Sequence, residues 1–342
     1  MTGIGTAKPR IAIYGTGQFG GMAARFALDK GWPVVAAYNR AGDKVGRDLG
    51  EVIGLDQKIG VIVEDCDTAD YSRLDADVGL VFTTNVLSQN FPAYERLIGA
   101  GCNVLCHGGQ SYHAMASDPE TATKIDALAK AQGVTFTGCG IWDMSRIWSG
   151  LLVIGPCTHI DSLLHRSITD AKGQAINPAQ ARQVGIGMTL AEFAESGLPQ
   201  SPLAISYTTV PALVLETAGY TITSRTAHIE PIVFEQDVDA EFLGGIMAAG
   251  MCVGTRIIGA IETAEGPTVR VEIELRLFRD GDVEHMYWEV EGMPRTRIRV
   301  ERDDSGHATT ASLFNRIPDV IAARPGVVTV AELGPLKTSA LL

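Results

Sequence analysis

The feature that most constrains this chain is a glycine-rich turn near its start. An apolar run, Ile-Ala-Ile-Tyr at 11–14, leads into glycines at the GxGxxG spacing, and an alanine-rich helical pattern follows. In a strand–turn–helix context, Gly15 permits a tight turn, Gly17 lets the backbone approach a pyrophosphate, and Gly20 lets helix and strand pack closely. Amides at the helix N-terminus then bind phosphate. We therefore expect a dinucleotide at Gly15, Thr16, Gly17, Gln18, Phe19 and Gly20.

The end of the next expected strand indicates which dinucleotide binds. The apolar run 33–38 precedes Asn39 and Arg40, about where an NAD site usually carries a carboxylate. Asn39 is neutral and does not repel a 2′-phosphate. The guanidinium of Arg40 is positively charged and can donate two parallel hydrogen bonds to such a phosphate. Lys44 adds charge nearby, although an ordinary solvated loop would also explain Arg40 and Lys44. We expect NADP, with NAD as the open alternative.

Two different periodicities divide the chain. Strand-length apolar runs separated by helix-length segments recur in the first part, at 61–63, 78–82, 103–105 and 134–136. That alternation predicts an α/β fold, a Rossmann doubly wound parallel sheet. At 268–278 apolar and charged residues alternate instead, which predicts a mainly antiparallel sheet with one buried and one polar face. We expect a Rossmann domain at 1–142, a second α+β domain at 143–310, and a C-terminal helix and tail at 311–342 that pack back on the first domain.

Composition limits the partners and the location. With 28 Lys and Arg against 40 Asp and Glu, the net charge is −12, and no basic cluster suits a nucleic acid. Residues 1–10 lack the apolar core of a signal peptide, and 242–261 is broken by glycines and Arg256, so we expect a cytoplasmic protein without a membrane span.

The six cysteines show neither a CxxC pair nor a zinc-module spacing, so we expect no metal site. Most have apolar, strand-like neighbours and are expected to be buried, reduced thiols. Cys106 and Cys139 lie near strand ends, which leaves a catalytic thiol open as an alternative.

Ligands of an open parallel sheet bind beyond the carboxyl ends of its strands, so the loops at 83–85, 107–113 and 138–143 should carry the chemistry. Histidine, tyrosine and carboxylate groups can move protons, and tryptophan suits the wall of an apolar pocket. We expect Thr83, Thr84, Asn85 and His107 near the nicotinamide, His107, Tyr112 and Asp143 in proton transfer, and Gln110, Trp142 and Trp148 around the substrate.

Each of these residues also has a structural interpretation. The segment 83–85 is equally suited to a capped turn, and His107 to a structural or surface position. Tyr112 and the two tryptophans suit core packing, and Asp143 suits the cap of a helix at 144–151.

Four segments carry a resemblance to a known family: GTGQFG at 15–20, KVGRDLGEVIG at 44–54, GCGIWDMSRIW at 138–148 and ASLFNRIPDVIAARPGVVTVAEL at 311–333. They resemble the amine dehydrogenases related to 2,4-diaminopentanoate dehydrogenase, within the wider dihydrodipicolinate-reductase-like group. The resemblance covers most of the chain and implies an NAD(P)-dependent oxidoreductase, usually a homodimer, that converts an amine to a carbonyl compound and ammonia by hydride transfer. The polar sheet face accordingly meets either solvent or a second subunit.

The loop after the fifth strand departs from the family pattern. Family members carry a glutamate there, in what resembles the role of a base that handles ammonia, whereas residues 107–112 contain no carboxylate. Gln110 forms hydrogen bonds but takes up no proton. We therefore expect an NADPH-preferring oxidoreductase of an amine, imine or carbonyl carbon, with reduction of an imine or carbonyl favoured over amination from free ammonia. A catalytically silent NADPH-binding sensor or scaffold, and a sugar or polyol dehydrogenase, are the alternatives.

Overall fold

The structure, a computed structural model, describes residues 8–173 and 177–338. The first residues of the expected Rossmann domain, 1–7, and the last of the expected tail, 339–342, lie outside the described residues. No helix within the described ranges is both long and apolar enough to cross a membrane.

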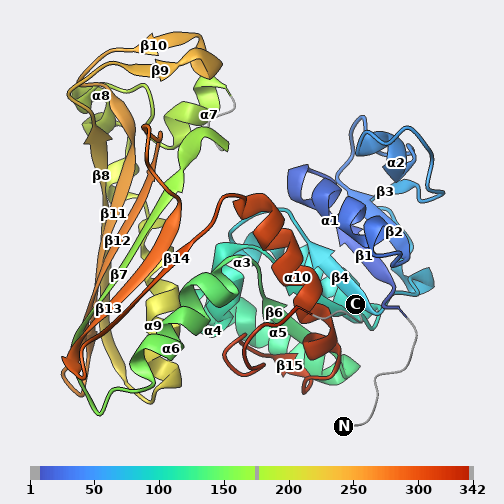
Figure 1. Ribbon diagram of the computed structural model, residues 1–342. Coiled ribbons are helices and arrows are strands. Elements are labelled where there is room, and N and C mark those ends of the chain that lie inside the picture. The colour runs from blue at the N-terminus through green and yellow to red at the C-terminus, as the bar shows by residue number, and fades with distance from the viewer. Residues whose placement is uncertain (1–7, 174–176, 339–342) are drawn as a thin grey trace. The chain divides into compact units, whose positions relative to one another are not determined.

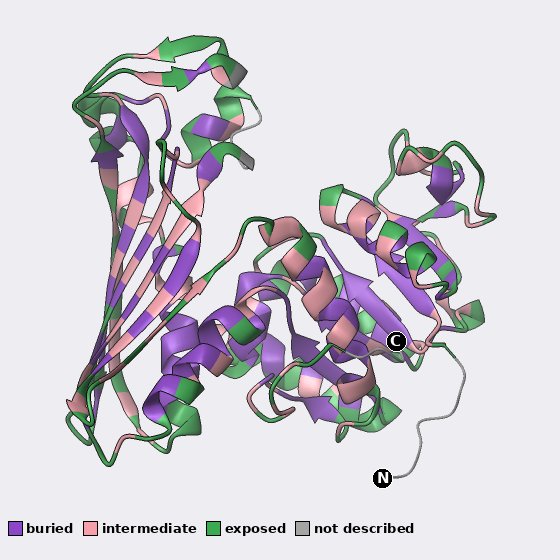
Figure 2. Cartoon of the chain, viewed as in Figure 1, coloured by how far each residue is buried: buried purple, intermediate pink, exposed green. Residues whose placement is uncertain are grey.

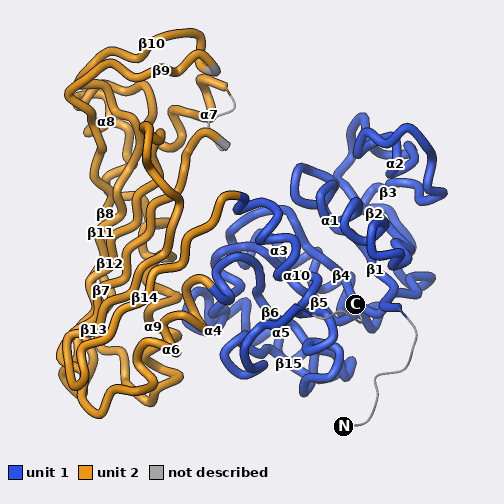
Figure 3. Tube along the Cα trace, in the orientation of Figure 1, with its two compact units in different colours: residues 1–144, 304–342 blue, residues 145–303 orange. Residues whose placement is uncertain are grey.

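The chain divides into two compact units (Figure 3). The first combines residues 1–144 with 304–342, and the second spans 145–303. The second unit ends at Asp303 rather than at 310, because the helix that belongs to the first unit already begins at Ser305.

A seven-stranded parallel sheet is the centre of the first unit (Figure 1). Its strand order is β15-β6-β5-β4-β1-β2-β3, so the direction of winding reverses between β1 and β4. A ligand crevice is expected at that reversal, beyond the carboxyl ends of the strands. The predicted doubly wound fold is confirmed. The strands are β1 (Ile11–Tyr14), β2 (Val34–Asn39), β3 (Val63–Asp65), β4 (Val78–Val81), β5 (Asn103–Cys106), β6 (Thr135–Gly138) and β15 (Gly326–Val327).

Helices cover both faces of this sheet. Helix α1 packs with α10, and α3 packs with α5. The α5 helix has the predicted signals, since Asp118 accepts a hydrogen bond from the Thr121 amide and Gly133 ends the helix with φ +70°. The helices are α1 (Gln18–Asp29), α2 (Leu49–Val52), α3 (Leu87–Gly99), α4 (Ala114–Ser117), α5 (Pro119–Gln132) and α10 (Ser305–Ile321), with 3-10 turns at Tyr71–Arg73 and Gly109–His113.

The second unit is built on a six-stranded sheet of order β14-β13-β7-β12-β11-β8. Its neighbours are antiparallel except for β7 and β12, so the prediction of a mainly antiparallel sheet is confirmed. A two-stranded sheet, β9 with β10, is separate. The strands are β7 (His159–Asp170), β8 (Ile222–Val233), β9 (Val238–Ala240), β10 (Gly245–Met247), β11 (Cys252–Thr263), β12 (Thr268–Arg276), β13 (His285–Met293) and β14 (Thr296–Glu301).

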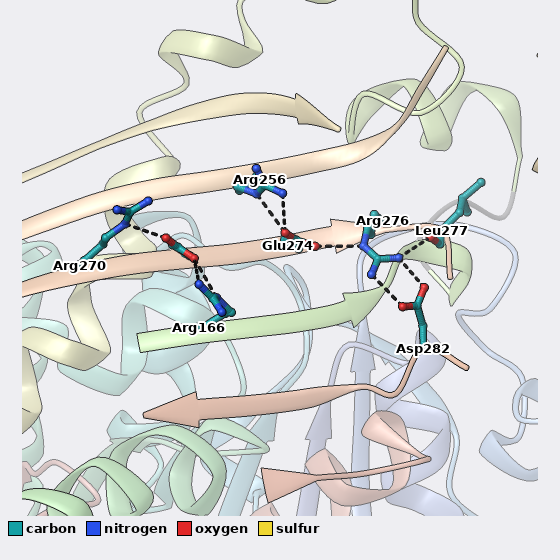
Figure 4. A network of polar contacts seen from close by, with 8 residues as sticks. Arg166, Arg256, Arg270, Glu274, Arg276, Leu277 and Asp282 are labelled. Atoms are coloured by element: carbon teal, nitrogen blue, oxygen red, sulfur yellow. Dashed lines mark hydrogen bonds and ion pairs between the residues drawn. The ribbon is translucent and has the colours of Figure 1, made fainter. Parts of the chain in front are cut away.

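The two faces of this six-stranded sheet differ as the alternation in β12 predicted (Figure 2). Val269, Val271 and Ile273 lie in the buried core. The opposite face carries ion pairs, including Arg166 with Glu272 at 2.6 Å (Figure 4). The helices of this unit are α6 (Ser149–Ile154), α7 (Pro178–Gln183), α8 (Leu190–Glu195) and α9 (Thr209–Thr217), and a π-helix at Asp143–Trp148 leads into α6.

Candidate active site

The glycine turn has the close approaches that its spacing predicts. Gly15 has φ +97°, and a Cβ there would lie 2.7 Å from the carbonyl oxygen of Phe82. A Cβ on Gly20 would overlap the carbonyl oxygen of Gly15, so helix α1 packs on β1 without a side chain between them. A Cβ on Gly17 would meet no described atom within 4 Å. The turn is therefore closely packed at Gly15 and Gly20 and open at Gly17.

The N-terminus of α1 is free to receive an anion. No side chain among the described residues caps the helix, and its first turn contains no acidic residue. Backbone amides there and the helix dipole favour a phosphate. Thr16 adds a hydroxyl that is buried and has no hydrogen-bond partner among the described residues. An open backbone, uncapped amides and an unused hydroxyl together fit the pyrophosphate of a dinucleotide.

The end of β2 is tied to the glycine turn. The Thr16 amide donates to Oδ1 of Asn39 at 3.3 Å, and Nζ of Lys44 donates to the Thr16 carbonyl at 2.8 Å. Arg40 is exposed beside them. Asp65, at the end of β3, is the residue paired in register with Asn39, so one carboxylate lies on a neighbouring strand.

The loops after β4 and β5 are held together by hydrogen bonds. The Gly109 amide donates to Oδ1 of Asn85 at 3.1 Å, and the Gln110 amide donates to the Asn85 carbonyl at 3.2 Å. Oε1 of Gln110 accepts from the Leu87 amide at 2.8 Å and so caps α3, whose own N-cap residue is Val86. Asn85 and Gln110 therefore fix the shape of the site as well as bordering it.

The two threonines before Asn85 are engaged locally. The hydroxyl of Thr83 bonds to Oδ1 of Asn90, and the Thr84 amide donates to the same oxygen at 3.2 Å. The Val86 amide donates to the Thr84 hydroxyl at 3.1 Å. The segment 83–85 thus forms the capped turn that was one of its two interpretations.

His107 lies between two aromatic rings at the end of β5. Its ring centroid is 5.0 Å from that of Phe19 and 5.4 Å from that of Phe82. Burial lowers its pKa, so the imidazole is neutral at pH 7. Nδ1 lies 3.3 Å from the carbonyl oxygen of Val81, which can only accept, so Nδ1 carries the proton and Nε2 keeps its lone pair.

Tyr112 and Trp142 pack against each other, with ring centroids 5.2 Å apart. Tyr112 is buried, and a Cβ on Gly140 would lie 2.6 Å from its hydroxyl. Burial raises the pKa of Tyr112 well above its usual value, so the phenol keeps its proton. A Cβ on Gly109 would touch the Trp142 ring at 3.4 Å, an ordinary contact, so that position accepts a side chain.

Asp143 forms a fully buried ion pair with Arg316 of α10. Nε and Nη2 of Arg316 donate to the two carboxylate oxygens at 2.9 and 2.8 Å. Burial raises the pKa of Asp143 to about 6 against the opposing charge of Arg316. The two residues are 173 positions apart, and no local sequence signal indicated the pair.

Neither candidate thiol is activated. Burial raises the pKa of Cys106, and raises that of Cys139 well above its usual value. Among the described residues, the one group with metal-ligand geometry is Asp65, Cys66 and Asp67, and Asp67 is paired with Arg96 at 2.8 Å.

The predicted site residues separate between the units. Every one except Trp148 belongs to the first unit, and Trp148 is half-buried in the second. Sequence reasoning missed Arg316, and it also missed a buried polar group in the second unit around Arg146 and His165.

An open glycine turn at the reversal point of a parallel sheet, joined to an α+β unit, defines a class of enzyme: the chain is an NAD(P)-dependent oxidoreductase. The family model for the 2,4-diaminopentanoate dehydrogenase C-terminal domain matches residues 151–340. The chain belongs to that family, as its sequence motifs predicted.

Individual relatives are similar to this protein over nearly the whole chain. The 2,4-diaminopentanoate dehydrogenase of Acetoanaerobium sticklandii is 27% identical over 341 residues, 95% of this chain and 93% of the relative. The structure of an amine dehydrogenase from Mycobacterium smegmatis matches with a TM-score of 0.84 and 28% identity, over 97% of this chain and 98% of that one. The dihydrodipicolinate reductase of Paenisporosarcina sp. TG-14 shares the fold, with a TM-score of 0.53, 11% identity and coverage of 95% and 99%.

Proposed function

We propose that this protein is an NADPH-preferring oxidoreductase that transfers hydride to or from an amine, imine or carbonyl carbon. The observation that carries the proposal is the open, uncapped glycine turn of a chain whose relatives are named for oxidising amines. A bound nicotinamide would supply or accept the hydride. The protein then has to bind the dinucleotide, position the substrate and move one proton.

Cofactor selection rests on the end of β2. Asn39 holds the turn through Thr16 and brings no negative charge, and exposed Arg40 is available for the 2′-phosphate. Lys44 adds a second positive charge next to the turn. The carboxylate of Asp65 on the adjacent strand is the feature that would favour NAD instead.

We assign proton transfer to His107 among the three candidates. Its Nε2 lone pair accepts the proton that leaves when an amine or alcohol is oxidised, and in the direction of reduction the ring first takes a proton from solvent at Nε2 and then gives it to the imine or carbonyl product. The loop that carries His107 is fixed by the contacts of Asn85 and Gln110. Asp143 is committed to Arg316, and Tyr112 is packed in the interior, so both act by positioning the loops. Thr83, Thr84 and Asn85 shape the nicotinamide side of the site.

The proposed preference for an imine or carbonyl substrate follows from the absence of a carboxylate at residues 107–112. Amination from free ammonia needs repeated proton transfers and a group that stabilises a cationic iminium, whereas reduction of a ready-made imine or carbonyl needs one proton. Gln110 is neutral and is already used to cap α3. We therefore place imine or carbonyl reduction first, with Gln110, Trp142 and Trp148 as substrate contacts.

The polar face of the second unit's sheet is proposed as a homodimer contact. Helices pack on the opposite face, and here half-buried Leu164, Ile168 and Ile258 lie between the ion pairs of Figure 4. A Leu164→Glu, Ile258→Glu double variant should sediment as a monomer while the wild type sediments as a dimer. Equal sedimentation of both proteins would remove this assignment.

Two measurements test the activity. NADPH should bind with measurable heat and more tightly than NADH, and NADPH oxidation should begin on addition of cyclic imines or of aldehydes and ketones. If NADPH binds but no imine, carbonyl or amine, with or without ammonia, is turned over, the chain is the silent sensor or scaffold instead. If neither reduced dinucleotide binds to folded protein, the proposal fails.

A further inference from the structure

Helix α3 carries two polar side chains on the face that packs into the core of the first unit. Asn90 and Tyr94 are four residues apart, so they lie on one face of the helix, and their exposed fractions are 2% and 0%. Leu87 and Leu97, each three residues away from one of them, are fully buried on the same stripe. A polar group at such a position costs stability unless its hydrogen-bonding atoms are paired. The partners of Asn90 and Tyr94 therefore show what these side chains do.

The side-chain amide of Asn90 pairs with the loop after β4. Its Nδ2 donates to the Thr84 carbonyl at 2.8 Å, and its Oδ1 accepts from the Thr84 amide at 3.2 Å and from the Thr83 hydroxyl. Both backbone polar groups of Thr84 are thus held by one side chain. Nδ2 also donates to Sγ of Cys106 at 3.7 Å, at the end of β5, so Asn90 contacts the chain at the ends of two neighbouring strands.

The Cys106 thiol accepts hydrogen bonds from two further groups. The Tyr94 hydroxyl donates to Sγ at 3.1 Å, and the Gly108 amide donates to Sγ at 3.3 Å. The Tyr94 oxygen also lies 3.2 Å from Oγ of Ser111, farther along the loop after β5. Asn90 and Tyr94 therefore hold that loop through one buried sulfur atom.

The residues on either side of His107 both belong to this network. Cys106 precedes His107 and supplies the sulfur, and Gly108 follows it and donates to that sulfur. A Cβ on Gly108 would lie 2.6 Å from the Thr84 carbonyl oxygen, so the chain at Gly108 is packed closely against the loop after β4. The backbone of His107 is therefore fixed on both sides, in the position from which Nδ1 reaches the Val81 carbonyl.

We propose that Asn90 and Tyr94 are positioning residues for the proton transfer assigned to His107. They act through the Cys106 thiol, and Asn90 acts through Thr84 as well. Together they hold the His107 ring where Nδ1 carries the proton and Nε2 is left to accept one. Such alignment matters because misplacement by about 1 Å can lower a rate about a hundredfold. The proposal rests on the proposed function for the step that His107 performs, whereas the orientation of the ring is a property of the protein alone.

Nuclear magnetic resonance of the histidine rings tests the orientation without cofactor or substrate. In the full chain labelled with ¹⁵N-histidine, His107 should show one protonated and one unprotonated ring nitrogen, assigned by the loss of both signals in His107→Gln. Cys106→Ala removes the acceptor, and Tyr94→Phe removes a donor but keeps the ring that packs on Phe136. In both variants the two signals should move toward each other, because a loosened Nδ1 hydrogen bond lets the two tautomers exchange. Unchanged His107 signals in both variants would overturn the proposal.

A conservative variant and a matched control separate positioning from general stability. Cys106→Ser keeps an acceptor at the same place and should keep the wild-type His107 signals. Tyr71→Phe also removes a hydroxyl, one that donates to the Cys66 carbonyl at 3.0 Å, and should lower stability without moving those signals. Equal movement in Tyr71→Phe and Tyr94→Phe would mean that the signals report stability alone, and would remove the assignment.

Asn90→Ala tests the second positioning residue. It leaves Thr84 without its side-chain partner and removes one donor to Cys106, so the His107 signals should move as they do in Tyr94→Phe. Wild-type signals in folded Asn90→Ala would restrict the role to Tyr94 and overturn the assignment of Asn90. Should this variant not fold, Tyr94→Phe and Cys106→Ala still decide whether the network positions His107.

Turnover separates this inference from the proposed function. At a temperature well below the unfolding midpoint of each variant, Tyr94→Phe and Cys106→Ala should lower kcat about tenfold or more, while the Kd for NADPH stays within about twofold of the wild type. Altered His107 signals in variants of a protein that turns over no imine, carbonyl or amine would leave the positioning standing and defeat the proposed function. Wild-type turnover with an unchanged kcat in both variants would leave the activity standing and defeat the positioning.

Discussion

Two arginines buried in the chain, Arg316 and Arg146, differ in the side chains to which they donate hydrogen bonds. Arg316 of α10 donates to both oxygens of Asp143 and, through Nη1, to Asp319 and the Gly334 carbonyl. Arg146 is buried almost as completely, yet Nη2 donates to the Ser167 hydroxyl. The carboxylates that accept from Arg316 neutralise its charge and tie α10 to the segment that follows β6. Two guanidinium groups that are buried to a similar degree thus donate to different chemical groups.

The largest expected effect comes from breaking the first pair. Arg316→Met leaves Asp143 buried beside an apolar side chain, and removal of one partner of a buried ion pair lowers the free energy of unfolding by about 3–5 kcal/mol. Urea unfolding followed by circular dichroism measures this loss. Arg146→Lys should lose much less stability in the same assay.

A double variant separates the charge from the packing of the pair. Asp143→Leu with Arg316→Met removes both charges and should recover much of the stability that Arg316→Met loses. A loss under about 1 kcal/mol for Arg316→Met alone would mean that α10 is held by its apolar contacts instead.

A third arginine, exposed Arg40, extends the comparison to the cofactor. If it binds the 2′-phosphate, Arg40→Ala should raise the Kd for NADPH roughly ten- to a hundredfold and leave that for NADH nearly unchanged, because hydrogen bonds to charged groups contribute about 1.5–3 kcal/mol. Fluorescence titration with both dinucleotides measures the two constants. Arg47→Ala, another exposed arginine of the same loop, is the matched control. Equal losses for NADPH and NADH would contradict the assignment.

Local sequence patterns predict the glycine turn and the sheet faces. The GxGxxG spacing requires close approaches that only glycine allows, so the roles of Gly15 and Gly20 follow from the sequence alone. The strict alternation of β12 likewise predicts which face of the sheet is buried and which is polar.

Polar pairs between residues far apart in the chain could not be predicted from the sequence. Nothing near Asp143 indicates a partner at Arg316, and the helix-cap alternative for Asp143 rested on local chemistry alone. The contact of Arg146 with Ser167 depends on how the π-helix packs on β7, which periodicity does not encode. The role of Gln110 as a cap for α3 likewise depends on the packing of two loops that are separate in the sequence.

A carboxylate introduced into the loop after β5 would test why ammonia is disfavoured, because the carboxylate of Asp143 is already paired with Arg316. Gly109→Glu places the new side chain against Trp142 without a close contact at Cβ, and Gln110→Glu keeps an acceptor for the Leu87 amide. If ammonia use requires that carboxylate, either variant should raise ammonia-dependent NADPH oxidation about tenfold or more over the wild type. Gln110→Asn, which adds no charge, is the control. No gain from either glutamate would count against the missing carboxylate as the reason for the substrate preference.

The smallest effect on stability concerns His107, a buried histidine that lies beside aromatic rings, whereas buried His165 lies near the charge of Arg146. Burial lowers the pKa of His107, so the unfolded chain binds its proton more readily than the folded one. The contribution of His107 to stability is therefore complete above the unfolded pKa of about 6.5 and falls as the pH drops below it. His107→Gln should flatten the decline in unfolding free energy between about pH 6.5 and 5 in urea titrations, and should abolish turnover without weakening NADPH binding. An unchanged slope would mean that the His107 ring is hydrated, and unchanged turnover would move the proton-transfer role to another residue.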